Sequence, residues 1–240
     1  MPCTLATARV NFTSQLPPRP EIVPDLKKSV ALDLKFQIPV NYQKGAGDTY
    51  FSGKMLARLA RSMVVADQVD MVYCEGDGEG GHNEELAYCP EFELALKNLR
   101  SGVEVWLNGS AQAPFLYDND WGGLISCGCA YNGEIEGCLN QYPDCPALVD
   151  AGQNFGNAYY NDHHFHYGYH IYAAAVVMKY DHVWARQFVE QALLYIRDIA
   201  NPSPQDPFFP TWRHKDWCST IQHNTLDDPN STYCSIIHAL

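Results

Sequence analysis

The sequence lacks a long apolar run, because its longest uninterrupted one covers only residues 171–178. A membrane-spanning helix needs about 20 apolar residues, so we expect no such helix and no membrane as a partner. The first residues also lack a charged stretch followed by an apolar one, so no secretory signal peptide is visible. Either the protein stays inside the cell, or Met1 is not the original N-terminus.

Charge is scarce as well. Charged residues make up 18% of the 240 residues, against about 25% in typical soluble domains. The 16 basic and 28 acidic residues give a formal net charge of −12, which argues against nucleic acid or an anionic surface as a partner. Apolar residues reach 46%, which predicts a packed core over most of the chain.

Zinc-ribbon spacing is absent, since none of the nine cysteines belongs to a CxxC pair. Four cysteines lie close together in a Gly-rich stretch: Cys127, Cys129, Cys138 and Cys145. In an oxidising compartment one or two disulfides would form there, and reduced, partly buried thiols are the alternative. Three Asn-x-Ser/Thr sequons, at Asn11, Asn108 and Asn230, would permit glycosylation of a secreted protein.

Apolar periodicity predicts a mostly helical chain. Residues 1–40 are Pro-rich and are expected to be irregular. Four helices are predicted: 52–73 capped by Ser52, 90–108, 163–179, and a last one that begins after Asp181 and stops at Asn201. Residues 110–160 have no helical period and predict structured loops with short strands. Loops of this length in a compact domain are usually functional.

The densest run of polar and aromatic residues spans 157–170 and leads into an apolar helix. On that helix Asp162, His166 and His170 follow one another at intervals of four, so they can share one face. One interpretation makes Asp162 a general acid, tuned by a histidine and by aromatic walls. A second makes His163, His166 and His170 metal ligands, although the Glu of an HExxH motif is missing. In a third, the histidines are packed core residues without a function.

Three further clusters combine aromatic and polar residues. The first holds Asp118 and Trp121 in a Gly-flanked loop, which suits a sugar subsite or, alternatively, an Asx-turn with a half-buried Trp. The second, residues 48–54, lies at the N-terminus of the helix predicted over 52–73, and Lys54 inside its first turn opposes the helix dipole. Lys54 therefore faces a ligand or a carboxylate, or else is simply solvated. The third cluster runs over residues 209–217.

The sequence Tyr-Asn-Asp-His-His-Phe-His-Tyr-Gly-Tyr at residues 160–169, followed by an Ala-rich helix, resembles the signature of glycoside hydrolase family 81. The other clusters and residues 197–201 occur in the family's order. The resemblance implies an all-α fold, a partial (α/α)6 toroid with about the first half of the catalytic barrel, long loops and short strands. It divides the chain into a linker or remnant of an upstream domain (1–47), the partial catalytic domain (48–217) and a divergent tail (218–240).

Members of this family are endo-β-1,3-glucanases, so the resemblance implies a glucan endo-1,3-β-D-glucosidase with β-1,3-glucan as its partner. In an inverting enzyme one carboxylic acid protonates the leaving oxygen and a second carboxylate activates water. The resemblance maps the acid to Asp162. It assigns substrate contacts to Tyr50, Lys54, Asp118, Trp121, His166 and Asp216. This mechanism needs no cofactor and no metal.

The end of the chain departs from the family pattern. The glutamates that supply the family's base should follow Asp216, but no Glu follows Glu190. Asp227 and Asp228 are present in the tail, although no spacing supports either as a base. We therefore expect a truncated chain, with a catalytically inactive β-glucan-binding fragment as the alternative function. A metal-dependent hydrolase that uses the three histidines is the third.

The sequons and the secreted habit of many family members favour an extracellular or cell-wall location. The missing signal peptide leaves an intracellular one open.

Overall fold

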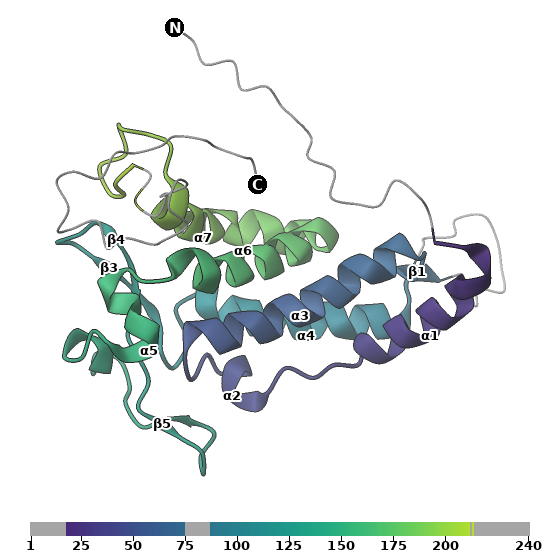
Figure 1. Cartoon of the computed structure of the whole chain (residues 1–240), viewed down its shortest axis with the longest axis horizontal. Helices are drawn as coiled ribbons and strands as arrows, with labels where there is room; N and C mark the ends of the chain where they lie inside the picture. Colours follow the sequence, from purple (N-terminus) through teal and green to yellow (C-terminus); the bar gives the residue numbers. More distant parts are fainter. Residues whose placement is uncertain (1–17, 75–86, 212, 214–240) are drawn as a thin grey trace, which may run out of the picture.

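Four long helices form the body of the described chain, which comprises residues 18–74, 87–211 and 213 in a computed structural model (Figure 1). They are α3 (Thr49–Gln68), α4 (Pro90–Leu107), α6 (His163–Tyr180) and α7 (His182–Ala200). Shorter helical pieces are η1 (Pro20–Ile22), α1 (Val23–Asp33), α2 (Val40–Gln43), η2 (Pro146–Leu148), α5 (Gln153–Gly156) and η3 (Asn157–Tyr159). The expectation of a mostly helical protein is confirmed.

The same residues hold three two-stranded antiparallel ribbons. They pair β1 (Tyr73–Cys74) with β2 (Ala87–Tyr88), β3 (Phe115–Asp118) with β4 (Gly123–Ser126), and β5 (Tyr131–Asn132) with β6 (Gly137–Cys138). The last two ribbons lie in the stretch where long loops and short strands are predicted.

The helices α3 and α6 run in the same direction and pack against each other along their lengths. At one end the carbonyl of Thr49 accepts a hydrogen bond from His170, and at the other Lys179 pairs with Asp67. The helices α4 and α7 run the opposite way, and the hydroxyl of Tyr195 donates to a backbone carbonyl near the end of α4. The N-termini of α3 and α6 therefore meet at the end that carries β3 to β6 (Figure 1).

The core lies between these four helices. Each contributes large buried side chains at helical spacing: Leu56, Leu59 and Met63 of α3, Phe92, Leu99 and Val103 of α4, Tyr167 and Val177 of α6, and Trp184 and Phe188 of α7. Full burial of each such apolar side chain contributes roughly 1.5–3 kcal/mol. No helix among the described residues is long and apolar enough to cross a bilayer.

Residues 1–40 are expected to be irregular, but residues 23–33 form the helix α1, so this expectation is wrong there. Pro24 lies in the first turn of α1, where its missing N–H leaves no helical hydrogen bond unmade. Val30 and Leu34 lie one turn apart and are buried in the common core. Prolines break helices in their interior, but a proline in the first turn also starts a helix well.

The start of α3 also differs from the prediction. The helix begins at Thr49, and its cap is Asp48, whose carboxylate accepts the N–H of Phe51 at 2.7 Å. Ser52, the predicted cap, is buried inside the helix. Aspartate and serine are equally good helix caps, so the local sequence does not decide between Asp48 and Ser52. The tertiary contacts of Thr49 favour Asp48.

Three disulfides are present in the described chain. They are Cys74–Cys89, Cys127–Cys145 and Cys129–Cys138. The last two confirm the bonding expected for the cysteine cluster and close a loop region, residues 127–148, that we call the disulfide lobe. The first joins β1 to the start of α4 and was not predicted, because neither of its cysteines belongs to that cluster.

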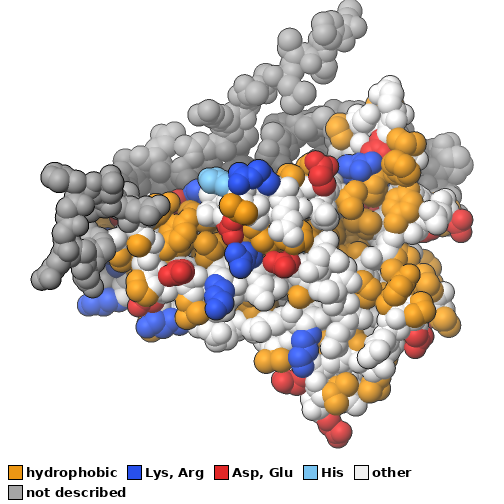
Figure 2. Space-filling model, turned by 180° about the vertical axis from the view of Figure 1, so that it is seen from behind, with side chains coloured by type: hydrophobic (Ala, Val, Ile, Leu, Met, Phe, Trp, Pro, Cys, Tyr) orange, Lys and Arg blue, Asp and Glu red, His pale blue; other side chains and the backbone are white. Residues whose placement is uncertain are grey.

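The end of the molecule around the disulfide lobe exposes many large apolar side chains. Figure 2 shows them gathered at this end, whereas charged side chains are spread over the helices. The exposed apolar residues of this region are Tyr131, Ile135, Leu139, Tyr142, Leu148 and Val149. Apolar patches of this kind mark interaction surfaces, so this end is where a functional site is to be sought.

The close approach of α3 and α6 at Gly53 gives a stability prediction. A Cβ at Gly53 would lie 2.9 Å from His170 Cδ2 and 3.0 Å from Tyr169 Cβ. We expect Gly53→Ala to lower the free energy of unfolding by about 1–3 kcal/mol, although alanine favours helix by about 1 kcal/mol.

The matched control is Gly168→Ala in α6, where an added Cβ would meet nothing within 4 Å. It should raise stability by up to about 1 kcal/mol. Urea denaturation of both variants measures the difference, and equal effects would contradict the close packing at Gly53.

Candidate active site

The segment that leads into α6 has a strained backbone. Of the six non-glycine residues with positive φ in the described chain, four lie within residues 154–162. They are Asn154 (53°), Phe155 (59°), Tyr160 (61°) and Asp162 (56°). Such conformations cost of order 1–3 kcal/mol each and cluster at functional sites. The segment must therefore be held by strong contacts with the rest of the molecule.

The first of these contacts is a buried pair between His163 and Asp198. His163 Nδ1 lies 2.6 Å from Asp198 Oδ2, and His163 Nε2 lies 2.8 Å from the carbonyl oxygen of Asn157. Both partners are acceptors, so these are the contacts of an imidazolium with a carboxylate on one side and a carbonyl on the other. The N–H of Leu124 donates to Asp198 Oδ1 at 2.8 Å. The pair thus joins the start of α6 to α7 and β4.

The second contact is Thr49, the first residue of α3. Its N–H donates to Asn154 Oδ1 at 3.0 Å, and its carbonyl oxygen lies 3.1 Å from His170 Nε2. Its hydroxyl accepts from Asn154 Nδ2 at 2.9 Å and lies 2.6 Å from His166 Nδ1. The hydroxyl also lies 3.1 Å from Asn154 Oδ1, so both this oxygen and His166 Nδ1 are within reach of its single proton. One buried threonine therefore positions two histidines and a strained asparagine.

Both histidines that contact Thr49 are neutral at neutral pH. Burial, together with the neighbouring His163 and His170, lowers the pKa of His166 to about 3. Burial lowers the pKa of His170 to about 4, although its hydrogen bond to Thr49 acts in the opposite direction. His166 therefore offers the site a neutral imidazole and not a cation.

Tyr50 is the centre of an aromatic cluster beside these histidines. Its ring centroid lies 5.6 Å from that of His166 and 5.8 Å from those of Phe155 and Tyr169. The exposed Lys54 places its Nζ 5.6 Å from the centroid of Tyr50. Three of the residues predicted to bind substrate, Tyr50, Lys54 and His166, are thus brought together at the start of α3.

Asp118 and Trp121 form a second group around Tyr160. The hydroxyl of Tyr160 donates to Asp118 Oδ2 at 2.9 Å, and Asp118 Oδ1 accepts the N–H of Asp120 in an Asx-turn. Trp121 follows in this turn with 49% of its surface exposed. The side chain of Arg213 donates to the carbonyl of Trp121 and lies 4.2 Å from the ring centroid of Tyr160. The Asx-turn and the half-exposed Trp considered from the sequence are both present.

Asp162 directly precedes α6 and is half-buried. Its backbone carbonyl accepts the N–H groups of Phe165 and His166, at 3.0 and 3.1 Å, but its side chain does not cap the helix. The left-handed backbone takes the carboxylate away from the N–H groups that it would otherwise cap. Asn161 Nδ2 donates to its Oδ2 at 3.3 Å. In the sequence, Asp162 lies between Tyr160, which belongs to the group of Asp118 and Trp121, and His166, which belongs to the group of Tyr50.

The histidines do not form the metal site considered from the sequence. His163, His166 and His170 are bonded to different partners in different directions. No three His, Cys, Asp or Glu side chains are placed to hold a metal ion in the part of the chain that the structure describes. The predicted contact Asp216, and the tail aspartates Asp227 and Asp228, lie outside the described residues.

Sequence analysis missed the residues that hold the site together, above all Thr49, Asn154 and Asp198. For Asp198 a signal existed. It is three residues beyond Tyr195 and next to Ile199, so it lies on the apolar inner face of α7. A carboxylate at such a position needs a buried partner, and His163 is that partner. Thr49 and Asn154 carry no comparable signal, because their partners are more than 100 residues away.

The pair of His163 and Asp198 gives a second stability prediction. Asp198→Asn leaves a buried imidazolium without its charge partner, so we expect a loss of about 3–5 kcal/mol in the free energy of unfolding. Asp67→Asn, which breaks the exposed pair with Lys179 on the same face of the bundle, should cost less than about 1 kcal/mol. Chemical denaturation of both variants measures the two losses in the free energy of unfolding. Equal losses would contradict the structural role of the buried pair.

The lowered pKa values predict that acid weakens the fold. A histidine whose folded pKa lies below its unfolded value takes up its proton only on unfolding, so falling pH favours the unfolded state. From about pH 6.5 downwards, we expect a loss of up to about 1.4 kcal/mol per pH unit for each of His166 and His170.

Urea denaturation across this pH range measures the slope. His170→Gln should flatten it, whereas His182→Gln, at an exposed position at the start of α7, should keep the slope of the parent chain. A His170→Gln slope as steep as that of the parent would rule out this explanation.

Comparison with known proteins assigns the family. The glycosyl hydrolase family 81 C-terminal domain matches residues 20–223. A glucan endo-1,3-beta-D-glucosidase of Glycine max is 34% identical over 156 residues, which cover 64% of this chain and 18% of that protein. The primary septum glucan endo-1,3-beta-D-glucosidase of Schizosaccharomyces pombe is 31% identical over 192 residues, which cover 76% of this chain and 16% of that protein.

A solved structure of a glycoside hydrolase family 81 protein from Clostridium thermocellum is 25% identical, with a TM-score of 0.46 over 82% of this chain and 22% of that one. The chain thus spans less than a quarter of the length of each of these relatives. Because the family domain matches most of its residues, the chain belongs to glycosyl hydrolase family 81.

Proposed function

We propose that this chain carries part of the active site of an inverting endo-β-1,3-glucanase, with Asp162 as the general acid. The observation that supports this most is the strained segment 154–162, which presents the half-buried Asp162 at the start of α6. The matched relatives from soybean and fission yeast are glucan endo-1,3-beta-D-glucosidases, which supports the same substrate class. In this mechanism Asp162 protonates the glycosidic oxygen as the bond breaks.

The proposed substrate contacts fall into two groups in the structure, one around Tyr50 and His166 and the other around Tyr160. On one side, Tyr50 offers a ring face to a sugar, while Lys54 offers a donor and the neutral ring of His166 a hydrogen-bonding group to its hydroxyls. On the other, Trp121 offers a half-exposed indole face and Asp118 offers acceptor oxygens. Asp216 remains a proposed contact.

The base that activates water stays unassigned, because the family's glutamates are missing here and no Glu follows Glu190. In an inverting enzyme it would lie about 6.5–9.5 Å from Asp162, across the sugar ring.

The helices fit a larger architecture in this proposal. The parallel pair α3 and α6, with α4 and α7 antiparallel to it, would form part of an (α/α)6 toroid. The catalytic segment stays proposed as residues 48–217, with α1 packed against it from upstream. The three disulfides support an extracellular or cell-wall location, because such bonds persist in oxidising compartments.

The test is Asp162→Asn, which removes the proton donor and keeps the size of the side chain. We expect turnover of linear β-1,3-glucan, followed by reducing ends, to fall by about 10²–10⁴-fold while binding measured by calorimetry persists. Asp150→Asn, at an exposed position in the disulfide lobe region, is the matched control and should keep parental turnover.

Equal turnover in the parent and in Asp162→Asn would remove Asp162 from the mechanism. A parent chain that binds glucan without cleaving it would instead support the glucan-binding alternative. A folded chain that neither binds nor cleaves glucan would contradict the proposal as a whole.

A further inference from the structure

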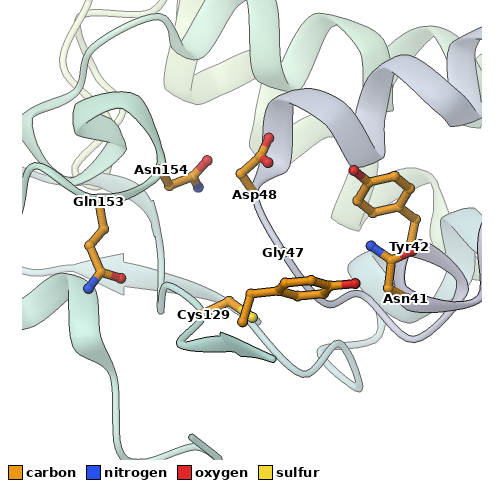
Figure 3. Close-up of a pocket in the computed structure, with 8 residues that line it drawn as sticks. Asn41, Tyr42, Gly47, Asp48, Cys129, Gln153 and Asn154 are labelled. Atoms are coloured by element: carbon orange, nitrogen blue, oxygen red, sulfur yellow. The ribbon is translucent and has the colours of Figure 1, made fainter. Parts of the chain in front are cut away.

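A cavity of about 320 Å³ opens next to the start of α3 (Figure 3). It is lined by Asn41, Tyr42, Gly47, Asp48, Cys129, Tyr131, Gln153 and Asn154. These residues come from three separate parts of the chain: α2 and the turn after it, the disulfide lobe, and α5. Its size is at the lower end of the roughly 300–1,000 Å³ of small-molecule sites, so it suits one small ring better than a stretch of polymer.

The lining chemistry suits a neutral ring that carries hydroxyl groups. Tyr42 and Tyr131 offer ring faces with hydroxyl tips, and the amides of Asn41 and Gln153 offer both donors and acceptors. Among the eight described lining residues there is no Lys or Arg that could neutralise a phosphate or sulfate. The charged lining residue is Asp48, whose pKa is raised by burial, so a second negative charge would be disfavoured there.

The walls of the cavity are held in place before any ligand enters. Tyr131 lies in the short ribbon of β5 and β6, and Cys129, two residues before it, is bonded to Cys138 at the end of β6. On the facing side, Asn154 is held by Thr49 through three hydrogen bonds of 2.9–3.1 Å. A preformed cavity binds with a smaller loss of conformational entropy than one that must be assembled.

The cavity and the proposed active site share the first turn of α3. Asp48 caps this turn, and Asn154 bonds Thr49, whose hydroxyl contacts His166. The next residue, Tyr50, belongs to the aromatic cluster of the active site. Figure 3 shows Asn154, Asp48 and Tyr42 approaching the cavity from different elements. A polysaccharide bound at the active site therefore has a second place to anchor within a short distance along α3.

We propose that this cavity binds one glucosyl ring of the β-1,3-glucan, separate from the rings on either side of the cleaved bond. In this arrangement the ring face lies on Tyr131, and Gln153 and Asn41 hydrogen-bond its hydroxyls. The inference rests on the proposed function, because its ligand is the same polysaccharide. It adds a specificity site, which favours chains long or branched enough to fill the cavity as well as the active site.

The experiment titrates linear and β-1,6-branched β-1,3-gluco-oligosaccharides into the full chain by calorimetry. All variants carry Asp162→Asn, so that no ligand is consumed. We expect Tyr131→Ala to weaken binding about tenfold, which corresponds to about 1.4 kcal/mol. Gln153→Ala, which leaves the ribbon of Tyr131 untouched, should also weaken binding, by several-fold. Thermal melts of each variant confirm that it is folded.

The matched control is Tyr73→Ala. Tyr73 and Tyr131 are each 50% exposed and each lie in a two-residue strand, but Tyr73 is in the ribbon of β1 and β2 and does not line the cavity. Its substitution should leave the affinity unchanged. A loss with Tyr73→Ala as large as with Tyr131→Ala would show a general effect of losing a surface tyrosine and would overturn the inference.

The remaining outcomes separate this inference from the proposed function. A loss confined to branched ligands identifies the bound ring as a branch, and an equal loss for both identifies it as part of the main chain. If the parent chain cleaves glucan while Tyr131→Ala and Gln153→Ala keep full affinity, only the cavity proposal is overturned. If a folded parent chain binds no glucan at all, both proposals are overturned.

Discussion

The buried pair of His163 and Asp198 is the contact on which the candidate site depends. Each of its partners would be strongly destabilising alone, because a charge without a partner is costly inside a protein. Together they join α6, α7 and β4 at one point, directly beside the left-handed residues Tyr160 and Asp162. The rigid contact and the strained backbone are therefore neighbours. The buried pair restrains the strained backbone beside it. The orientation of the Asp162 backbone therefore depends on a contact between α6 and α7.

Thr49 has a similar role on the opposite flank of the motif. Through its backbone and hydroxyl it fixes His166, His170 and Asn154, and it does so at the N-terminus of the helix that packs most closely on α6. The low pKa of both histidines follows from this burial, because the protein interior disfavours the charged form of the ring. The same first turn lies between the aromatic cluster around Tyr50 and the cavity beside the disulfide lobe.

The helices could be predicted because their signals are local. Apolar spacing, the first-turn Pro90 and the cap Asp181 are all read from neighbouring residues, and α4 and α7 begin where these signals place them. The errors arose where one local signal had two meanings. Pro24 predicts irregular chain but lies in the first turn of α1, and Asp48 rather than Ser52 caps α3. In both cases packing against distant residues selected between conformations that the local sequence allows.

The sequence by itself determined the helical body, the clustering of cysteines and the motif of residues 157–170 that carries the family resemblance. Only the tertiary structure decided which of its polar groups meet. His163 contacts Asp198 on α7, whereas His166 and His170 contact Thr49 on α3. The three histidines therefore do not share a metal site. The tertiary structure also placed the tyrosines and amides of three separate segments around one cavity. The physical reason is that helix formation is encoded in contacts three or four residues apart, whereas a site is assembled from side chains that only the packing of whole elements brings together.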